Sequence, residues 1–409
     1  MSGIHWRRRG ACPSLAQPMP TGDGLLARLN PAWGALTAGQ LAGIAQAALE
    51  HGNGLIEITS RASLQIRGLT ETTAPRFNEA IAALGIALRQ GLPVETGPLA
   101  GLDATALTDP TPLVQDLHQR LADSGLDGKL GPKVSIAIDD GGALPPGDSH
   151  ADIRLEAQAG STILWRVRAN GAQTEGITAD NAVRITLMLL NKVAGKGITA
   201  RARDLTKQEL ADCGLTSCAD GTTPSRISAP AVGLFLLHDS SFARSARFVY
   251  GVALPFGQIH AGTLLALAAT LDTTTPLRLA ASGLLAVGLT PSQAQQWLAA
   301  AKEQGFIIAP DDPRLAIHTC AGAPACASAH LDTKGLANAL SHRPAVVESH
   351  LRLHLFGCEK QCARPTTPAL LLTGSAEGCT VSTTGQPLSD NLQTTLQDLA
   401  SQYRTTSSA

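Results

Sequence analysis

The sequence predicts an α+β fold that contains a duplicated ferredoxin-like unit. Three observations support this prediction: the order of strand and helix patterns up to residue 84, the return of part of that pattern later in the chain, and the composition. Apolar residues make up 44 % and charged residues 16 % of the 409 residues, which is typical of folded globular domains. A chain of this length is expected to form about two to four domains.

The first unit begins with a strand and a helix. Residues 25–29 are mostly apolar and predict a strand. Thr37 and Gln40 have the spacing of a capping box, in which each side chain satisfies the other residue's backbone donor. Apolar residues then recur at helical spacing up to Leu49, and the glycine-containing segment 51–54 predicts the helix end.

Two strands and a second helix complete this unit. Ile56 and Ile58 alternate with polar residues, as do Leu64 and Ile66, so both strands are predicted to be half-buried. The next helix is predicted to start at Pro75, because proline is favoured in a first helical turn. The order strand–helix–strand–strand–helix is typical of a ferredoxin-like unit.

The same pattern returns in the second half of the chain. Residues 256–272 match residues 36–52 at an offset of 220, and Gly288-Leu289 then match Gly68-Leu69 at the same offset. We interpret this as an internal duplication. The alternative is a coincidence between two helices that are both rich in alanine and leucine.

Further elements are predicted between and after the two copies. Residues 134–138, 153–156 and 163–167 predict strands, and residues 180–194 predict a helix. Another helix is predicted over residues 291–304, with Thr290 as its N-cap and Pro291 in its first turn. The polar segment 221–229 contains glycine and proline and is the best candidate domain boundary.

Charge and hydropathy narrow the functional classes. The net charge of −1 gives no electrostatic reason to expect a nucleic-acid partner. No apolar run reaches the roughly 18 residues of a membrane span, and the basic residues 1–20 lack the apolar stretch of a signal peptide. We therefore expect a cytoplasmic protein, in which clustered cysteines indicate metal ligands rather than disulfides.

Two pairs of cysteines carry the strongest chemical signal. Five residues separate Cys320 from Cys326, and three separate Cys358 from Cys362. Two short loops that each carry two thiolates can supply the four ligands of a 4Fe–4S cluster. Zinc is the competing metal, although its paired cysteines favour two to four intervening residues, and four unrelated buried thiols are the third possibility. The other cysteines, Cys12, Cys213, Cys218 and Cys379, form no further ligand pattern.

The cysteine segments HTCAGAPACASAH and FGCEKQCARP resemble the cluster motif of the nitrite/sulfite reductase superfamily. Cys320, Cys326, Cys358 and Cys362 occupy its four ligand positions. The stretches RRRGACPSLAQPMPTGDGLLARL and HGNGLIEITSRASLQIRGL are most similar to the precorrin-3B synthase family within that superfamily. The resemblance implies two ferredoxin-like half-domains (1–84 and 226–295), a first α+β tetrapyrrole-binding domain (85–225) and a 4Fe–4S cluster domain (296–409).

This resemblance also implies an activity. Precorrin-3B synthases hydroxylate the tetrapyrrole precorrin-3A with O2 and close a lactone, in aerobic cobalamin biosynthesis. The implied cofactors are the cluster and a mononuclear non-haem iron, with an electron donor whose identity the sequence does not give. The alternatives are a sirohaem-dependent sulfite or nitrite reductase and a non-catalytic electron carrier or tetrapyrrole-binding protein. His51, His318, His330 and His354 lie in or near the matching segments, but their spacing identifies no iron ligand and no catalytic residue.

Basic residues are the candidates for binding such a substrate, because guanidinium groups bind carboxylates bidentately. Arg28, Arg61 and Arg67 lie on or beside the strands of the first half-domain. Arg28 and Arg61 match basic positions of the family, and Lys133 resembles the lysine of its Leu-Pro-x-Lys-Phe motif. A solvated strand-edge charge is the alternative for each. The chain departs from the reductases at Ser135, where they usually have a second basic residue, and at residues 279–283, where they often have Trp-Arg.

Overall fold

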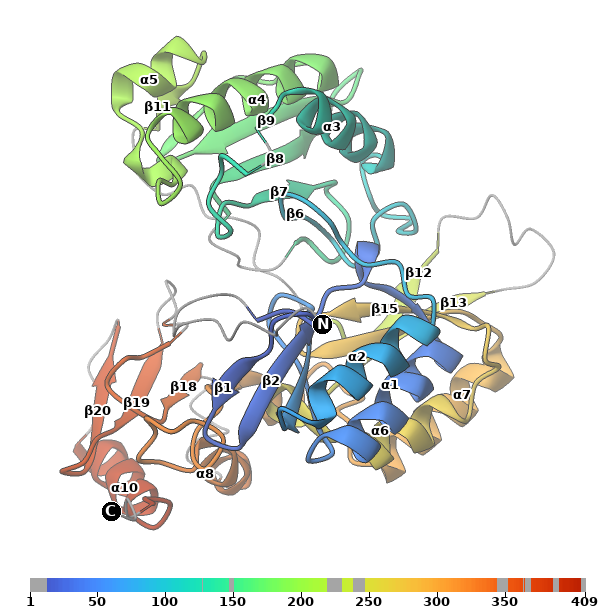
Figure 1. Ribbon diagram of the computed structural model, residues 1–409, viewed down its shortest axis with the longest axis vertical. Coiled ribbons are helices and arrows are strands. Elements are labelled where there is room, and N and C mark those ends of the chain that lie inside the picture. The colour runs from blue at the N-terminus through green and yellow to red at the C-terminus, as the bar shows by residue number, and fades with distance from the viewer. Residues whose placement is uncertain are drawn as a thin grey trace.

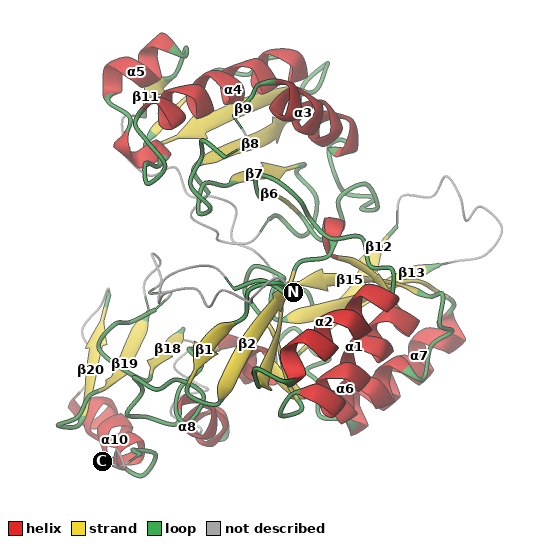
Figure 2. Cartoon of the chain, in the orientation of Figure 1, coloured by secondary structure: helices red, strands yellow, loops and turns green. Residues whose placement is uncertain are grey.

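The computed structural model describes residues 13–126, 128–146, 151–218, 230–237, 247–343, 352–362, 364, 369–384 and 390–405. The strands of this described part form four sheets, and helices cover them as Figures 1 and 2 show. The fold is a mixed α+β architecture with two ferredoxin-like half-domains. Segment 221–229, the predicted boundary, lies outside the described residues, as does Cys12.

Each half-domain contributes one five-stranded sheet. The first sheet has the order β1 (Met19–Thr21), β2 (Gly24–Leu29), β5 (Leu64–Leu69), β4 (Leu55–Ile58) and β14 (Gln258–His260). The other has the order β12 (Gly233–Leu236), β13 (Phe248–Ala253), β16 (Gly283–Leu289), β15 (Pro276–Ala280) and β3 (Ala35–Thr37). The half-domains therefore exchange one strand each, because β3 pairs with β15 and β14 pairs with β4.

Four helices pack on one side of these two sheets (Figure 1): α1 (Ala38–His51), α2 (Thr73–Ala83), α6 (Ala261–Ala268) and α7 (Pro291–Glu303). Residues of both half-domains form one continuous hydrophobic core beneath them. The capping box predicted at Thr37 is present, and the predicted N-cap Thr290 also forms a capping box, with Gln293. Helix α2 starts at Thr73 rather than Pro75, since the Thr70 hydroxyl accepts a hydrogen bond from the Thr73 N–H at 3.1 Å.

The duplication is confirmed, but its register differs from the single predicted offset. Trp33 and Phe256, which are 223 residues apart, hold the same left-handed conformation, with φ of 57° and 55°. Each lies in a short 3-10 helix, η1 (Ala32–Gly34) or η3 (Pro255–Gly257), just before the exchanged strand. After the helices the offset is 220, as Gly68 and Gly288 show with φ of 69° and 76°. The three-residue difference arises because the segments containing α1 and α6 differ in length.

The middle of the chain forms a six-stranded sheet with its own hydrophobic core. Its order is β11 (Thr216–Ser217), β10 (Ala172–Gln173), β9 (Leu164–Ala169), β8 (Ile153–Gln158), β7 (Ile136–Asp139) and β6 (Val94–Thr96). Helices α3 (Thr111–Asp123) and α4 (Ala179–Gly195) cover one face, and η2 (Ala202–Asp204) and α5 (Lys207–Asp212) follow (Figure 1). The three strands and the helix predicted here are present, and each end lies within two residues of its predicted position.

The C-terminal part contains the cysteine segments. Its sheet has the order β17 (Ile317–Thr319), β18 (Leu353–Phe356), β19 (Leu370–Gly374) and β20 (Cys379–Thr383), with η4 (Pro313–Ala316) before it. Helices α8 (Thr333–Ser341) and α10 (Asp390–Ser401) bury leucines against this sheet. No element was predicted for the polar segment that forms α10. Among the described residues, no helix combines the length and apolar character needed to cross a membrane.

Candidate functional site

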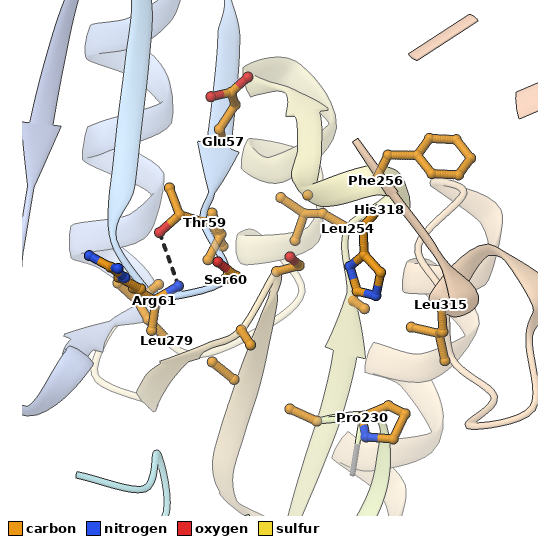
Figure 3. Close-up of a pocket in the computed structure, with 18 of the residues that line it drawn as sticks. Glu57, Thr59, Ser60, Arg61, Pro230, Leu254, Phe256, Leu279, Leu315 and His318 are labelled. Atoms are coloured by element: carbon orange, nitrogen blue, oxygen red, sulfur yellow. Dashed lines mark hydrogen bonds between the residues drawn. The ribbon is translucent and has the colours of Figure 1, made fainter. Parts of the chain in front are cut away.

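A cavity of about 790 Å³ lies where the two half-domains, the middle domain and the cysteine domain meet. The β4–β5 turn and its duplicate, the β15–β16 turn, both reach it. The middle domain contributes the end of β6, and the cysteine domain contributes β17, β18 and the segment before β17. Figure 3 shows Arg61 and His318 on opposite walls of this cavity.

The fold brings the two cysteine segments together. Strands β17 and β18 are parallel neighbours, so Cys320 follows one strand and Cys358 follows the other at the same sheet edge. The Cys320 N–H donates to the Leu355 carbonyl at 3.0 Å, and the Gly357 N–H donates to the Cys320 Sγ at 3.1 Å. The His330 N–H donates to the Gly357 carbonyl at 2.6 Å. Both loops are therefore tied to each other through their backbones.

The charge environment of Cys320 includes two other predicted ligands. Burial raises the pKa of the Cys320 thiol, and the charges of Cys326 and Cys358 raise it further, while the N–H groups of Gly357 and Gly322 oppose that rise. Cys320 and Cys362 line the cavity, and Cys362 is exposed. Two cysteine loops that meet at one sheet edge, with backbone N–H groups directed at the Cys320 sulfur, are compatible with the donor set of a 4Fe–4S cluster.

A mononuclear iron would need its own group of ligands, separate from the four cysteines. Among the described residues, no three His, Cys, Asp or Glu side chains are grouped so that they could hold one ion. The thiolates of a cubane each bind a different iron, so they are spread more widely than the donors around one ion. The ligands of a mononuclear iron are therefore not identified in the described residues, and we assign it no role.

The four predicted basic residues occupy different environments. Arg61 is exposed and lines the cavity. Arg28 and Lys133 are not among the lining residues; Lys133 is exposed just before β7. Arg67 is only 2 % exposed and contacts protein groups: its guanidinium donates to Asp23 twice at 2.9 Å and to the Ala325 carbonyl at 2.6 Å.

A row of polar side chains crosses the first sheet and corrects the prediction of half-buried strands. Arg28, Gln65, Glu57 and Gln258 are lateral neighbours on β2, β5, β4 and β14. With the Gln65 amide oxygen turned toward Arg28, that amide accepts from the Arg28 Nη2 at 2.6 Å and donates to Glu57 at 2.9 Å. Gln258 donates to Glu57 at 3.1 Å. Glu57 and Gln65 are buried, and Arg28 and Gln258 are partly buried, so this face of the strands is not solvated as the alternating pattern predicted.

Two histidines and a lysine at the cavity were not assigned from the sequence. His318 and His354 are cross-strand neighbours on β17 and β18, and their rings stack at 4.7 Å between centroids. Burial, the His318 ring and Arg352 together lower the pKa of His354 to about 4, so its imidazole is neutral at pH 7. Lys334 donates to the Phe256 carbonyl at 2.6 Å, and burial lowers its pKa. Only the pairing of distant strands brings these residues to one wall, so no local sequence signal could have identified them.

Comparisons with known proteins agree with this architecture. Residues 17–84 match the profile of the nitrite/sulfite reductase ferredoxin-like half domain. The NirA protein of Mycobacterium tuberculosis has a similar structure, with a TM-score of 0.65 and 16 % identity, over 88 % of this chain and 73 % of that chain. A ferredoxin–nitrite reductase of Synechococcus elongatus is 33 % identical over 149 residues, which is 34 % of this chain and 27 % of that protein.

A longer match defines the family. A precorrin-3B synthase from Sinorhizobium sp is 39 % identical over 382 residues, which is 91 % of this chain and 82 % of that protein. The chain belongs to the precorrin-3B synthase family.

Proposed function

We propose that this protein is a precorrin-3B synthase, an oxidoreductase that adds one oxygen atom of O2 to precorrin-3A and forms a lactone. The observation that carries this proposal is the 39 % identity to a precorrin-3B synthase over 91 % of the chain. The balanced reaction uses one O2, two electrons from an external donor and two protons. One oxygen atom enters the product and the other leaves as water.

The cavity has the properties that such a substrate requires. Its volume of about 790 Å³ falls within the usual range of roughly 300–1,000 Å³ for ligand sites. Arg61 is exposed at the β4–β5 turn, and no other side chain engages its guanidinium in the described part of the chain, so it is free to bind a substrate carboxylate. Arg28 does not line the cavity and instead donates to the turned Gln65 amide, so its role in binding stays a prediction from the family position. Lys133 stays a prediction from the family motif.

The cluster would be held by Cys320, Cys326, Cys358 and Cys362, and when bound it supplies single-electron transfer. The protein itself orients the substrate and limits water. His354 is neutral at pH 7 because its pKa is lowered to about 4, so its imidazole places no charge on the cavity wall beside His318. The end of β6 and the segment before β17 enclose the remaining walls.

A turnover assay tests this proposal. Anaerobically reconstituted protein, supplied with precorrin-3A, a chemical reductant and isotopically labelled O2, should yield a product that contains one labelled oxygen atom. We expect Arg61→Ala to raise KM for precorrin-3A about tenfold, because a charge-assisted hydrogen bond contributes roughly 1.5–3 kcal/mol. Arg76→Ala, an exposed change on α2 outside the cavity, is the matched control and should leave KM unchanged.

The competing function is a sirohaem-dependent reductase, which the half-domain profile and the partial match to a nitrite reductase favour. Ser135 disfavours it, because its hydroxyl carries no charge for a small anion. A sirohaem absorption spectrum in the isolated protein, with nitrite or sulfite reduction and no oxygen transfer to precorrin-3A, would overturn our proposal.

A further inference from the structure

Trp33 is an exposed aromatic residue at the cavity wall. It is 39 % exposed, whereas Trp165 and Trp297 are 3 % and 1 % exposed. Its φ of 57° and ψ of 15° place it in the left-handed region, which is unfavourable for a bulky residue. The strained backbone of Trp33 costs free energy, and its exposed side chain gains little packing energy in return. We therefore expect a bound ligand to supply the compensating contacts.

The duplication supplies an internal comparison. Phe256 has the same backbone conformation in the second half-domain, but it packs against the hydrophobic core of the cysteine domain. Trp33 joins none of the hydrophobic cores that the described residues form. Both side chains line the cavity, but only Phe256 is also held by a hydrophobic core, whereas Trp33 is left without one.

Arg89 lies on the same wall as Trp33. The Ala32 N–H donates to the Ala87 carbonyl at 2.8 Å, and the Arg89 N–H donates to the Asn30 carbonyl at 2.9 Å, so these two segments run side by side. Arg89 lines the cavity. Burial lowers the pKa of its guanidinium, and Glu95 is the one opposing charge. Within the described part of the chain, the Arg89 guanidinium makes no hydrogen bond, which is costly for a half-buried cation.

We propose that Trp33 and Arg89 bind the substrate together, with the indole face against the macrocycle and the guanidinium paired with a peripheral carboxylate. This inference rests on the proposed function, since it takes its ligand class from the carboxylate-bearing tetrapyrrole. An aromatic face favours offset stacking on a flat π-system. A desolvated guanidinium forms bidentate bonds to a carboxylate. The two groups therefore select a large, flat and anionic ligand over a small anion.

Anaerobic titration with precorrin-3A tests the pair without turnover, and thermal unfolding of the same ligand-free variants tests their folding. Arg89→Ala should raise Kd at least tenfold and Arg89→Lys should raise it less, because lysine keeps the charge but loses the bidentate geometry. Trp33→Gly should raise Kd at least fivefold while Tm stays equal or rises, because glycine adopts a positive φ without strain. Trp33→Phe should retain part of the affinity. Arg76→Ala is again the control.

Each outcome is decisive. If the Trp33 and Arg89 variants bind precorrin-3A as the wild type does, the pair is not a substrate site, although the proposed function stands. If Trp33→Gly lowers Tm and leaves Kd unchanged, Trp33 is a structural residue and the inference is wrong. If the wild-type protein does not bind precorrin-3A, the proposed function fails and this inference fails with it.

Discussion

At the scale of single residues, three arginines with a similar sequence context have different environments. Arg28, Arg61 and Arg67 all lie on or beside the strands of the first half-domain, so the sequence gives each the same interpretation. Burial separates them: Arg61 faces the cavity, whereas Arg67 is enclosed with Asp23 and the Ala325 carbonyl. Arg67 thereby connects the first half-domain to the loop between Cys320 and Cys326, and we assign it to holding that loop rather than to binding substrate.

Removal of Arg67 should therefore affect stability before it affects substrate affinity. Arg67→Ala leaves the Asp23 and Glu57 carboxylates buried without their cation, and breaking a buried pair in this way costs roughly 3–5 kcal/mol. Urea unfolding of the two proteins measures this loss. The exposed control Arg76→Ala should change the free energy of unfolding by less than about 0.5 kcal/mol. Equal stability of wild type and Arg67→Ala would contradict the assignment.

The same pair has a defined pH dependence. Burial raises the pKa of Asp23, but its hydrogen bonds and charge interaction with Arg67 outweigh burial, so the pKa is lowered from 3.8. A carboxyl with a lowered folded pKa stabilises the protein above its unfolded pKa and loses that effect as pH falls through the folded pKa. The stability difference between wild type and Arg67→Ala should thus be constant from about pH 5 to 7 and shrink below about pH 3.8. A difference that grows on acidification would refute this.

At the scale of elements, the sequence predicts local structure better than pairing. Local patterns predict the capping box at Thr37, the N-cap Thr290, the helix over 180–194 and the strands of the middle sheet, and the structure contains them. Long-range pairing has no such signal. The exchanged strands β3 and β14, and the neighbours β17 and β18, pair with segments that are far apart in the chain, and such pairing produces no local periodicity in the sequence. Helix α10 was not predicted because most of its residues are polar, so its few buried leucines do not form a clear helical pattern in the sequence.

The close approach of the two cysteine loops depends on a glycine. A Cβ added at Gly357 would lie 2.6 Å from the Ala329 Cβ and 3.3 Å from the Gly322 Cα, so Gly357→Ala must push the loops apart. We expect this variant to retain less than about half of the wild-type iron and labile sulfide after reconstitution, since cluster ligands tolerate little displacement. Gly378→Ala in the β19–β20 turn, where an added Cβ meets nothing within 4 Å, is the matched control. Full cluster content in Gly357→Ala would argue against the four-cysteine site.

At the scale of the whole molecule, three large hydrophobic cores surround one cavity. The half-domains share the first core, and the middle and cysteine domains each have their own. Residues from all three bodies line the cavity. Each body can therefore unfold as a partly independent unit, and a ligand in the cavity contacts all of them at once.

A ligand placed there should couple the unfolding of these three bodies. Without substrate, calorimetry should show more than one transition, because separate cores unfold with separate free energies. Precorrin-3A should then be added under anaerobic conditions at about 100 times its Kd. It should raise the free energy of every unfolding step that destroys the site by roughly 2.7 kcal/mol, and the transitions should converge. A porphyrin whose carboxylates are all esterified is the control and should shift them little, because Arg61 and Arg89 would have no anion to bind. A shift of only the half-domain transition would mean that the middle and cysteine domains do not contact the substrate, and the shared cavity would then not be the binding site.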